Sequence, residues 1–149
     1  MGPYRRILVV LDLTDDSTPI GRRAQALAAT SGAELEFLHV VEFVPIEPMG
    51  ETLMPAVQIE EELIERAKQR LKALTAELGV PDAPARVEAG SVKSEIVRVA
   101  RERGADLIVL GSRERHGISI FVNLTEDTVL HQAPCDVLAV RVGGHKESG

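Results

Sequence analysis

The sequence has few of the features that assign a chain to a class at once, beginning with cysteine. Its only thiol is that of Cys135, so no internal disulfide can form, and a chain without disulfides suits a reducing compartment. Positive charge is also scarce, because 17 Lys and Arg residues stand against 23 Asp and Glu residues, for a net charge of -6. No uniformly basic surface is expected to attract a polyanion, so nucleic acid is excluded as the expected partner.

Long hydrophobic runs are missing as well. The apolar run from Ile7 to Leu11 is ended by Asp12, which leaves it far too short for the core of a signal sequence or for a membrane span. A chain of 149 residues, 44% of them hydrophobic, suits one domain of ordinary size. We expect a single domain over 1–149, with its core at about 5–142 and a flexible tail at 143–149. We also expect a cytoplasmic location and no membrane insertion.

Recognisable catalytic motifs are missing too. The chain has no Gly-x-x-x-x-Gly-Lys loop, and residues 12–16 lack the glycines of a dinucleotide fingerprint. A response-regulator receiver needs a phosphoacceptor Asp after its middle strand and a Lys near its last strand, and the sequence has neither. The histidines have no metal-ligand spacing, and we interpret His39, within an expected strand, as a satisfied core side chain. The sequence therefore predicts a protein that is not an enzyme and has no metal site.

What the sequence does contain is a regular alternation of apolar runs and amphipathic stretches. The apolar runs predict strands at 7–11, 35–41, 85–89, 107–110 and 137–142. The stretches between them predict four helices, at about 17–32, 59–78, 92–104 and 124–131. Strands that alternate with helices favour right-handed crossovers. We therefore predict an α/β three-layer sandwich around a five-stranded parallel sheet of order 3-2-1-4-5.

In a sheet of this order the winding reverses between the first and fourth strands. Ligands bind at such a switch point, beyond the carboxyl ends of the strands. Asp12 follows the first strand and Gly111 follows the fourth, so the two residues are expected to face each other across one cleft. Gly111 also opens the segment 111–117, whose glycines and serine can offer backbone N–H groups to a phosphate.

Four segments resemble the corresponding segments of universal stress proteins: 7–12, 38–41, 105–113 and 133–140. They occur in the family's order and spacing, and the resemblance extends from about Arg6 to Val142. It implies a Rossmann-like fold of the adenine nucleotide alpha hydrolase type, and a homodimer formed through the fifth strand, Val137 to Val142. An apolar run on an edge strand agrees with such pairing. The resemblance also implies that members of the family either bind nucleotides or have lost the site.

The resemblance further implies where a nucleotide would lie. In binding members an Asp after the first strand and the backbone of the second strand hold the adenine end, and a glycine motif after the fourth strand holds the ribose and phosphates. This chain keeps the Asp, the second-strand position and the first glycine, but it has Glu114 for the second glycine, Asn123 for the third, and Leu124 for the serine that follows. The candidate nucleotide-binding residues are Asp12, Val40, Gly111, Ser112, Arg113, Asn123 and Thr125.

The changed positions should weaken the site. A residue other than glycine adopts the left-handed conformation at a cost of roughly 1–2 kcal/mol, although Asn tolerates it. Glu114 brings a carboxylate that repels phosphate, and Leu124 lacks the hydroxyl of a serine. Together the changes cost on the order of a hundred- to thousandfold in affinity. Arg113, Arg115 and His116 can offset this as phosphate ligands, or they simply lie on a solvated loop.

Other residues keep a structural alternative. Asp12 is either a ligand or the cap of its own turn, and Thr125 is either a ligand or the cap of the last helix. Residues 42–57 form either a lid over the cleft, or a partner surface, or a plain crossover. A shift of one residue in the alignment of 117–129 changes which side chain of that segment faces the phosphates.

Two functions from different classes remain. The first is a non-enzymatic stress-response protein that acts as a homodimer and through protein partners, with a degenerate nucleotide site. The alternative is a switch that holds ATP or another adenine nucleotide, with Mg²⁺ if ATP is bound, in a relaxed version of that site. Glu114 and Leu124 are the residues that separate the two.

Overall fold

The computed structural model describes residues 3–42, 53–113, 129 and 131–142, with the backbone alone described at 53–58 and at 113. Its strands are β1 (Arg6–Val10), β2 (Glu34–Val41), β3 (Ala85–Ala89), β4 (Leu107–Arg113) and β5 (Asp136–Val142), and its helices are α1 (Ser17–Ser31), α2 (Leu53–Glu77) and α3 (Val92–Arg103). The described residues thus hold three helices where the sequence predicts four. The fourth, expected at 124–131, falls almost wholly outside them, although Val129 and His131 are helical.

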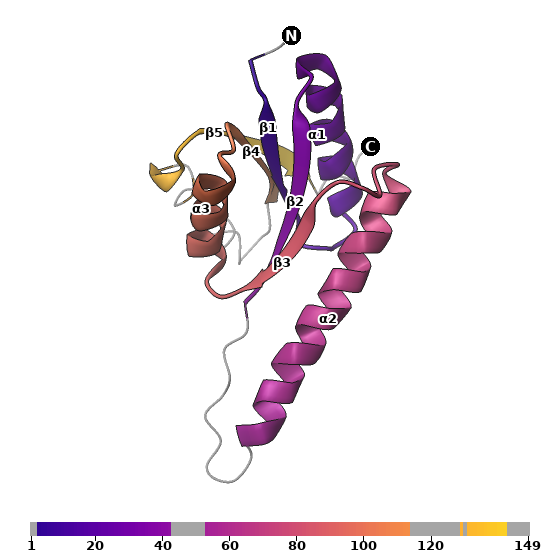
Figure 1. Ribbon diagram of the computed structural model, residues 1–149, viewed down its shortest axis with the longest axis vertical. Coiled ribbons are helices and arrows are strands. Elements are labelled where there is room, and N and C mark those ends of the chain that lie inside the picture. The colour runs from indigo at the N-terminus through magenta and orange to yellow at the C-terminus, as the bar shows by residue number, and fades with distance from the viewer. Residues whose placement is uncertain (1–2, 43–52, 114–128, 130, 143–149) are drawn as a thin grey trace.

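The strands form one five-stranded sheet of order β3-β2-β1-β4-β5, in which every neighbouring pair is parallel. Helices α1 and α2 cover one face of the sheet and α3 covers the other (Figure 1). The sheet is therefore the middle of three layers, and the predicted α/β sandwich and strand order are confirmed.

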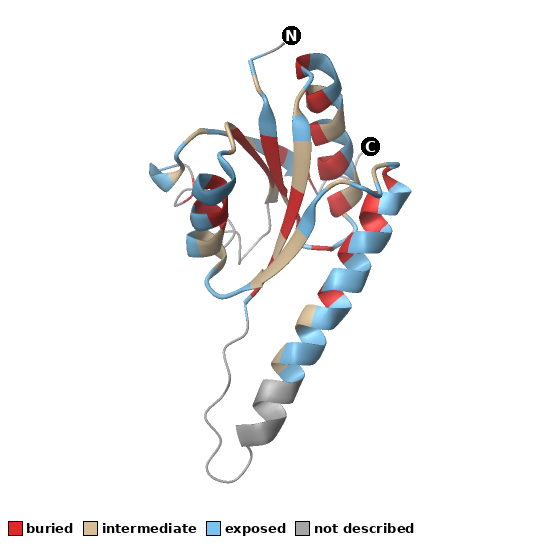
Figure 2. Ribbon diagram, viewed as in Figure 1, coloured by how far each residue is buried: buried red, intermediate tan, exposed pale blue. Residues whose placement is uncertain are grey.

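Each face of the sheet has its own aliphatic core, because successive residues of a strand point to opposite faces. On β1, Ile7 and Val9 pack beneath α1 and α2, whereas Leu8 packs with the residues of α3. Figure 2 shows the buried residues along the central strands and on the sides of the helices that face them. Burial on both faces explains why β1 is a continuous apolar run in the sequence.

Glycines end two of the helices. Gly32 (φ 72°) follows α1 and Gly104 (φ 66°) follows α3, and their N–H groups bond to the carbonyl oxygens of Ala28 and Ala100, respectively. The left-handed conformation costs glycine little, so it serves to close a helix. Both turns lead the chain back to the edge of the sheet at which the strands begin.

Side chains tie that amino edge together. The carboxylate of Asp106 accepts hydrogen bonds from the N–H of Arg5 at 2.9 Å and of Arg6 at 3.0 Å. The hydroxyl of Tyr4 donates to a carboxylate oxygen of Asp136 at 2.9 Å. The residues before β1 are thereby fixed to the starts of β4 and β5.

Helix α2 extends past the opposite, carboxyl edge of the sheet (Figures 1 and 2). It has 25 residues, which corresponds to a length of about 37 Å. Its apolar stripe is buried only where the sheet lies beneath it: Leu71 and Ala67 are 1% and 6% exposed, whereas Leu63 and Ile59 are 37% and 47% exposed. Neither α2 nor any other described helix is both long and apolar enough to cross a membrane.

Candidate functional site

The sheet divides at its carboxyl edge, between β1 and β4. The pairing of these two strands ends at Val9 and Val109, whereas β4 continues beside β5 as far as Arg113. The chain segments that follow the two strands therefore diverge, as they do at a topological switch point. Asp12 and Gly111 follow Val9 and Val109 on the two sides of this divergence.

Val40 lies on β2, the neighbour of β1 on its other side. The N–H of Phe37 bonds to the carbonyl of Pro84, on the β3 side, at 2.8 Å, whereas the carbonyl of Leu38 accepts the N–H of Leu11, on the β1 side, at 2.9 Å. Because backbone groups alternate in direction along a strand, the N–H and C=O of Val40 point the same way as those of Leu38. They therefore point toward the chain segment that follows β1. The side chain of Val40 is buried with those of α3.

Asp12 begins a tight turn between β1 and α1. Its Oδ1 accepts hydrogen bonds from the N–H of Thr14 at 3.2 Å and from Oγ1 of Thr14 at 2.8 Å, and from Oγ of Ser17 at 3.4 Å. A carboxylate that accepts the N–H two residues on takes the place of a backbone carbonyl, as in an Asx-turn. The capping role that the sequence allows for Asp12 is therefore present in the structure.

Leu13 has the left-handed conformation, with φ 61°, and no other non-glycine residue in the described part of the chain has a positive φ. That conformation costs a leucine roughly 1–2 kcal/mol, so the surrounding structure must hold it. The side chain is 6% exposed in the core beneath α1 and α2, and the carbonyl oxygen accepts a hydrogen bond from Nη2 of Arg70 on α2. Sequence reasoning missed this contact, since nothing in the sequence relates two residues that lie 57 positions apart.

His39 supports the same turn from β2. Its Nδ1 lies 2.7 Å from the carbonyl oxygen of Leu11, and because a carbonyl only accepts, Nδ1 carries the hydrogen. The ring is half-buried. The backbone on both sides of Asp12 is thus held by side chains, from β2 at Leu11 and from α2 at Leu13.

Gly111 lies within β4 and does not begin a loop. The sequence predicts that the strand ends at Leu110, but Gly111, Ser112 and Arg113 remain paired with β5, which carries the strand three residues further. Gly111 is not among the described glycines with a positive φ. A Cβ here would lie 2.7 Å from Cδ1 of Ile20 on α1. A side chain here would require the end of Ile20 to shift, and the expectation that the strand ends before Gly111 is wrong.

The structure brings four of the predicted site residues to one edge of three neighbouring strands: Asp12, Val40, Gly111 and Ser112. Of Arg113 it describes only the backbone. The other predicted residues and the changed positions lie outside the described residues: Glu114, Arg115, His116, Asn123, Leu124 and Thr125. Most of the segment 42–57 lies outside them as well.

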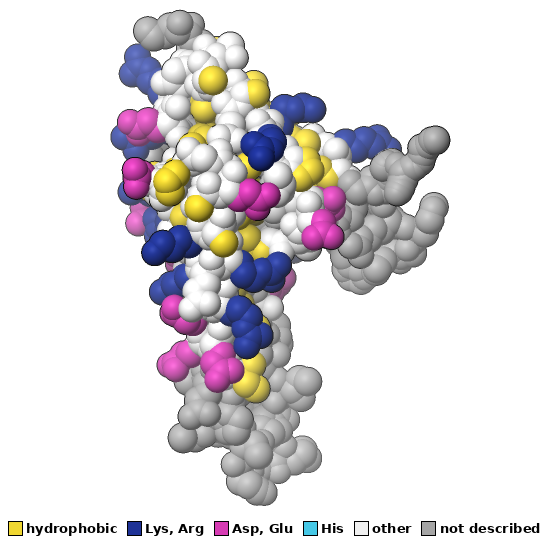
Figure 3. All heavy atoms as spheres, turned by 90° about the vertical axis from the view of Figure 1, so that its right-hand side faces the viewer, with side chains coloured by type: hydrophobic (Ala, Val, Ile, Leu, Met, Phe, Trp, Pro, Cys, Tyr) yellow, Lys and Arg dark blue, Asp and Glu magenta, His cyan; other side chains and the backbone are white. Residues whose placement is uncertain are grey.

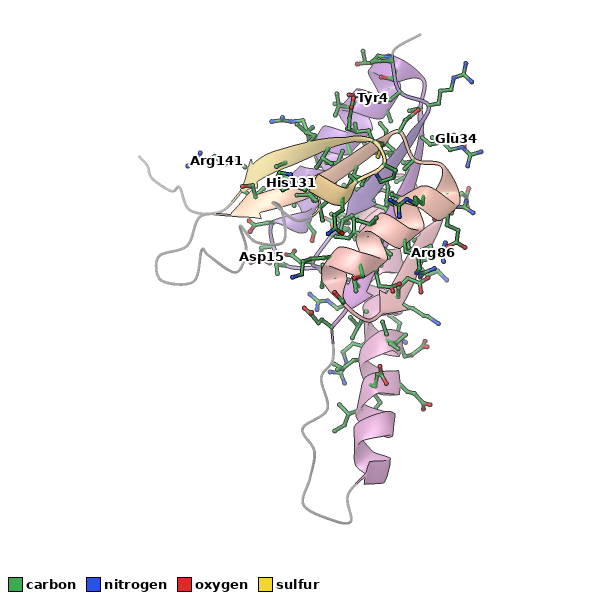
Figure 4. All side chains as sticks on the ribbon, turned by 90° about the vertical axis from the view of Figure 1, so that its left-hand side faces the viewer. Tyr4, Asp15, Glu34, Arg86, His131 and Arg141 are labelled. Atoms are coloured by element: carbon green, nitrogen blue, oxygen red, sulfur yellow. The ribbon has the colours of Figure 1, made fainter. Side chains whose placement is uncertain are left out.

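Charge at this edge is mixed in sign. Asp12, Asp15 and Asp16 follow β1, and Arg70 approaches the same turn from α2; Figure 4 shows Asp15 toward the end of the sheet opposite Tyr4 and Glu34. Positive and negative side chains are interspersed over the face formed by α1 and α2 (Figure 3). Within the described ranges no three His, Cys, Asp or Glu residues lie together as a metal site.

Comparisons with known proteins agree with this fold. The family model described as "Universal stress protein family" matches residues 3–141. The chain is 37% identical over 145 residues to universal stress protein A homolog 2 of Coxiella burnetii, which covers 97% of this chain and 99% of that protein.

Solved structures of the same family are similar as well. Universal stress protein UspA from Lactobacillus plantarum has a TM-score of 0.72 at 25% identity, over 95% of this chain and 100% of that one. A universal stress protein in complex with cAMP has a TM-score of 0.60 at 26% identity, over 93% of this chain and 98% of that one. This chain belongs to the universal stress protein family.

Proposed function

We propose that this chain is a cytoplasmic, single-domain stress protein without enzymatic activity, which acts as a homodimer and through protein contacts and has a weakened nucleotide site. One observation carries the proposal: two residues that match the nucleotide motif, Asp12 and Gly111, also make contacts within the fold. Asp12 caps the turn between β1 and α1, and Gly111 admits Ile20 of α1. Their presence therefore has an explanation within the fold, while two other positions of the motif, Glu114 and Leu124, have changed.

A second function, an adenine nucleotide switch, is supported by a different observation. The carboxylate of Asp12, the backbone of Val40 and the end of β4 lie at one edge where the strands diverge. That edge is where ligands bind in open α/β sheets, and a relative of the same fold is described in complex with cAMP. Backbone of β2 and the Asp12 carboxylate would then hold the adenine end, and Arg113, Asn123 and Thr125 the ribose and phosphates.

Calorimetric titration distinguishes the two functions. The protein is titrated with cAMP, and with ATP and Mg²⁺, at several hundred micromolar, beside Asp12→Ala and Asp12→Asn. Asn keeps an oxygen that can cap the turn but loses the charge, so it controls for collapse of the turn. The first function predicts no saturable binding in this range. Saturable binding that both variants lose would establish the switch in its place.

Mass spectrometry of the protein as purified gives an independent answer, because a retained nucleotide would exclude the weakened site.

Glu114→Gly is expected to strengthen binding of ATP by about tenfold if the rest of the site is intact, since it removes a carboxylate from beside a phosphate. An unchanged affinity would mean that Glu114 points away from the ligand.

A further inference from the structure

The turn that carries Asp12 has an unfavourable backbone conformation at Leu13, which contacts with other parts of the fold must stabilise. Leu13 has φ 61°, although a leucine strongly prefers negative φ. The hydrogen bonds from Thr14 to Asp12 span this residue. They fix the carboxylate of Asp12 relative to α1 only while Leu13 keeps its conformation.

Two groups hold Leu13 itself. Its side chain is buried with Leu71 and Leu74 of α2, which fixes where the side chain lies. Its carbonyl oxygen accepts the hydrogen bond from Arg70, which fixes the direction of the peptide group. A rotation of φ from the left-handed to the right-handed region reorients that peptide group, so the carbonyl cannot keep the Arg70 bond while Leu13 relaxes.

We propose that Arg70 is a positioning residue for Asp12: by binding the Leu13 carbonyl it holds the strained turn and so presents the Asp12 carboxylate at the divergence of β1 and β4. The proposal deepens the nucleotide-switch function and rests on it for its consequence in binding. The contact also makes α2 part of the site, because Arg70 stands next to Leu71, which is 1% exposed beneath the helix. A shift of α2 along the sheet would break the bond and release the turn.

The test compares Arg70→Met with Arg70→Lys and with Arg66→Met. Methionine keeps an apolar stem of similar length but has no donor, and lysine restores one donor. Arg66 lies one turn earlier on α2 and is exposed, so Arg66→Met removes the same charge from the same helix without touching Leu13. The φ-sensitive NMR coupling of Leu13 is measured in each variant, together with the affinity for cAMP and for ATP with Mg²⁺.

We expect Arg70→Met to move the Leu13 coupling toward that of negative φ and to weaken nucleotide binding by about tenfold, the effect of one lost charge-assisted hydrogen bond. Arg70→Lys should recover part of both effects, and Arg66→Met should change neither. An unchanged Leu13 coupling in Arg70→Met overturns the proposal, whatever happens to binding. If the parent protein binds neither nucleotide, the switch function fails, while the coupling still decides the role of Arg70.

A glycine at position 13 provides the second arm. Glycine adopts positive φ without strain, so in Leu13→Gly the Arg70 bond has no strained conformation to hold. This variant also lacks the buried side chain of Leu13, so the effect of Arg70→Met is measured relative to Leu13→Gly itself. The loss caused by Arg70→Met should then shrink to less than about twofold in the Leu13→Gly background, which is the signature of coupled residues. Equal losses in both backgrounds would mean that Arg70 acts on the ligand directly and would also overturn the proposal.

Discussion

At the scale of single residues, Gly111 packs closely against a side chain of α1. A Cβ added there would lie 2.7 Å from Cδ1 of Ile20 and 3.4 Å from Cγ2 of Val142. We expect Gly111→Ala to lower the free energy of unfolding by about 1 kcal/mol through overpacking, measured by urea denaturation. Ile20→Val deletes the crowding carbon, so adding Gly111→Ala to Ile20→Val should cost nothing further. An equal cost in both backgrounds would show that the packing explanation is wrong.

Cys135 gives a residue-scale prediction about pH. Burial, with smaller effects from the carboxylates of Asp106 and Asp136, raises the pKa of its thiol from 9.0 to about 11. Since the thiolate is the reactive form, the folded protein at pH 8 should react with iodoacetamide about 100-fold more slowly than the chain unfolded in urea. Because the folded pKa is the higher one, the thiol favours the folded state below about pH 9, and this contribution is lost as the pH rises toward 11. The stability of Cys135→Ser should not show this decrease between pH 9 and 11. Equal iodoacetamide labelling rates for the folded and unfolded chain would contradict the prediction.

For the candidate residues, the sequence leaves open roles that the structure describes in part. It allowed Asp12 to be either a ligand or a cap, and the structure contains the cap. It places Gly111 at the start of a loop, whereas the structure keeps this residue within β4, paired with β5. The sequence pattern does not reveal Arg70 or Leu13. The hydrogen bond of Arg70 joins elements that are distant in the sequence, and Leu13 is distinguished only by its backbone angle φ.

At the scale of elements, α2 provides a contrast within one apolar stripe. Leu71→Ala should cost about 2–5 kcal/mol, because the side chain is 1% exposed and leaves a cavity beneath the helix. Leu63→Ala, on the same stripe but 37% exposed, should cost less than about 1 kcal/mol. Urea denaturation of both variants measures the difference. Similar costs would mean that the N-terminal half of α2 is covered in solution.

The strands were the elements that the sequence predicted best. A central strand buried on both faces is a continuous apolar run, as β1 is. The predicted starts of β1 and β2 lie within one residue of the observed starts, and β3 has the predicted bounds. The end of β4 was placed three residues too early, because Gly111, Ser112 and Arg113 are not apolar. They are extended because β5 lies beside them, and pairing of that kind depends on a partner that local patterns do not contain.

At the scale of the whole molecule, the strand order was predictable because right-handed crossovers leave few arrangements for alternating strands and helices. The same order puts β5 at one end of the sheet, with β4 as its neighbour. The opposite end, β3, carries charged side chains: Arg86 pairs with Glu88 within the strand at 2.7 Å, and Arg98 of α3 pairs with the same Glu88 at 3.1 Å (Figure 4 labels Arg86). Charged side chains of this kind protect an edge from pairing, and β5 is the more apolar of the two edges.

The proposed dimer can therefore be tested at β5 alone. Edge pairing of two copies would continue the sheet, and light scattering should then give twice the 16.1 kDa of one chain. Ala139, exposed in the middle of β5, would lie close to its counterpart near the two-fold axis. Ala139→Lys should shift the protein to monomers at micromolar concentration, because it sets like charges against each other on facing strands, while Ala139→Ser, a polar change without charge, should leave the dimer intact. A mass of one chain for the parent protein, or a dimer that survives the lysine, would place the interface elsewhere or remove it.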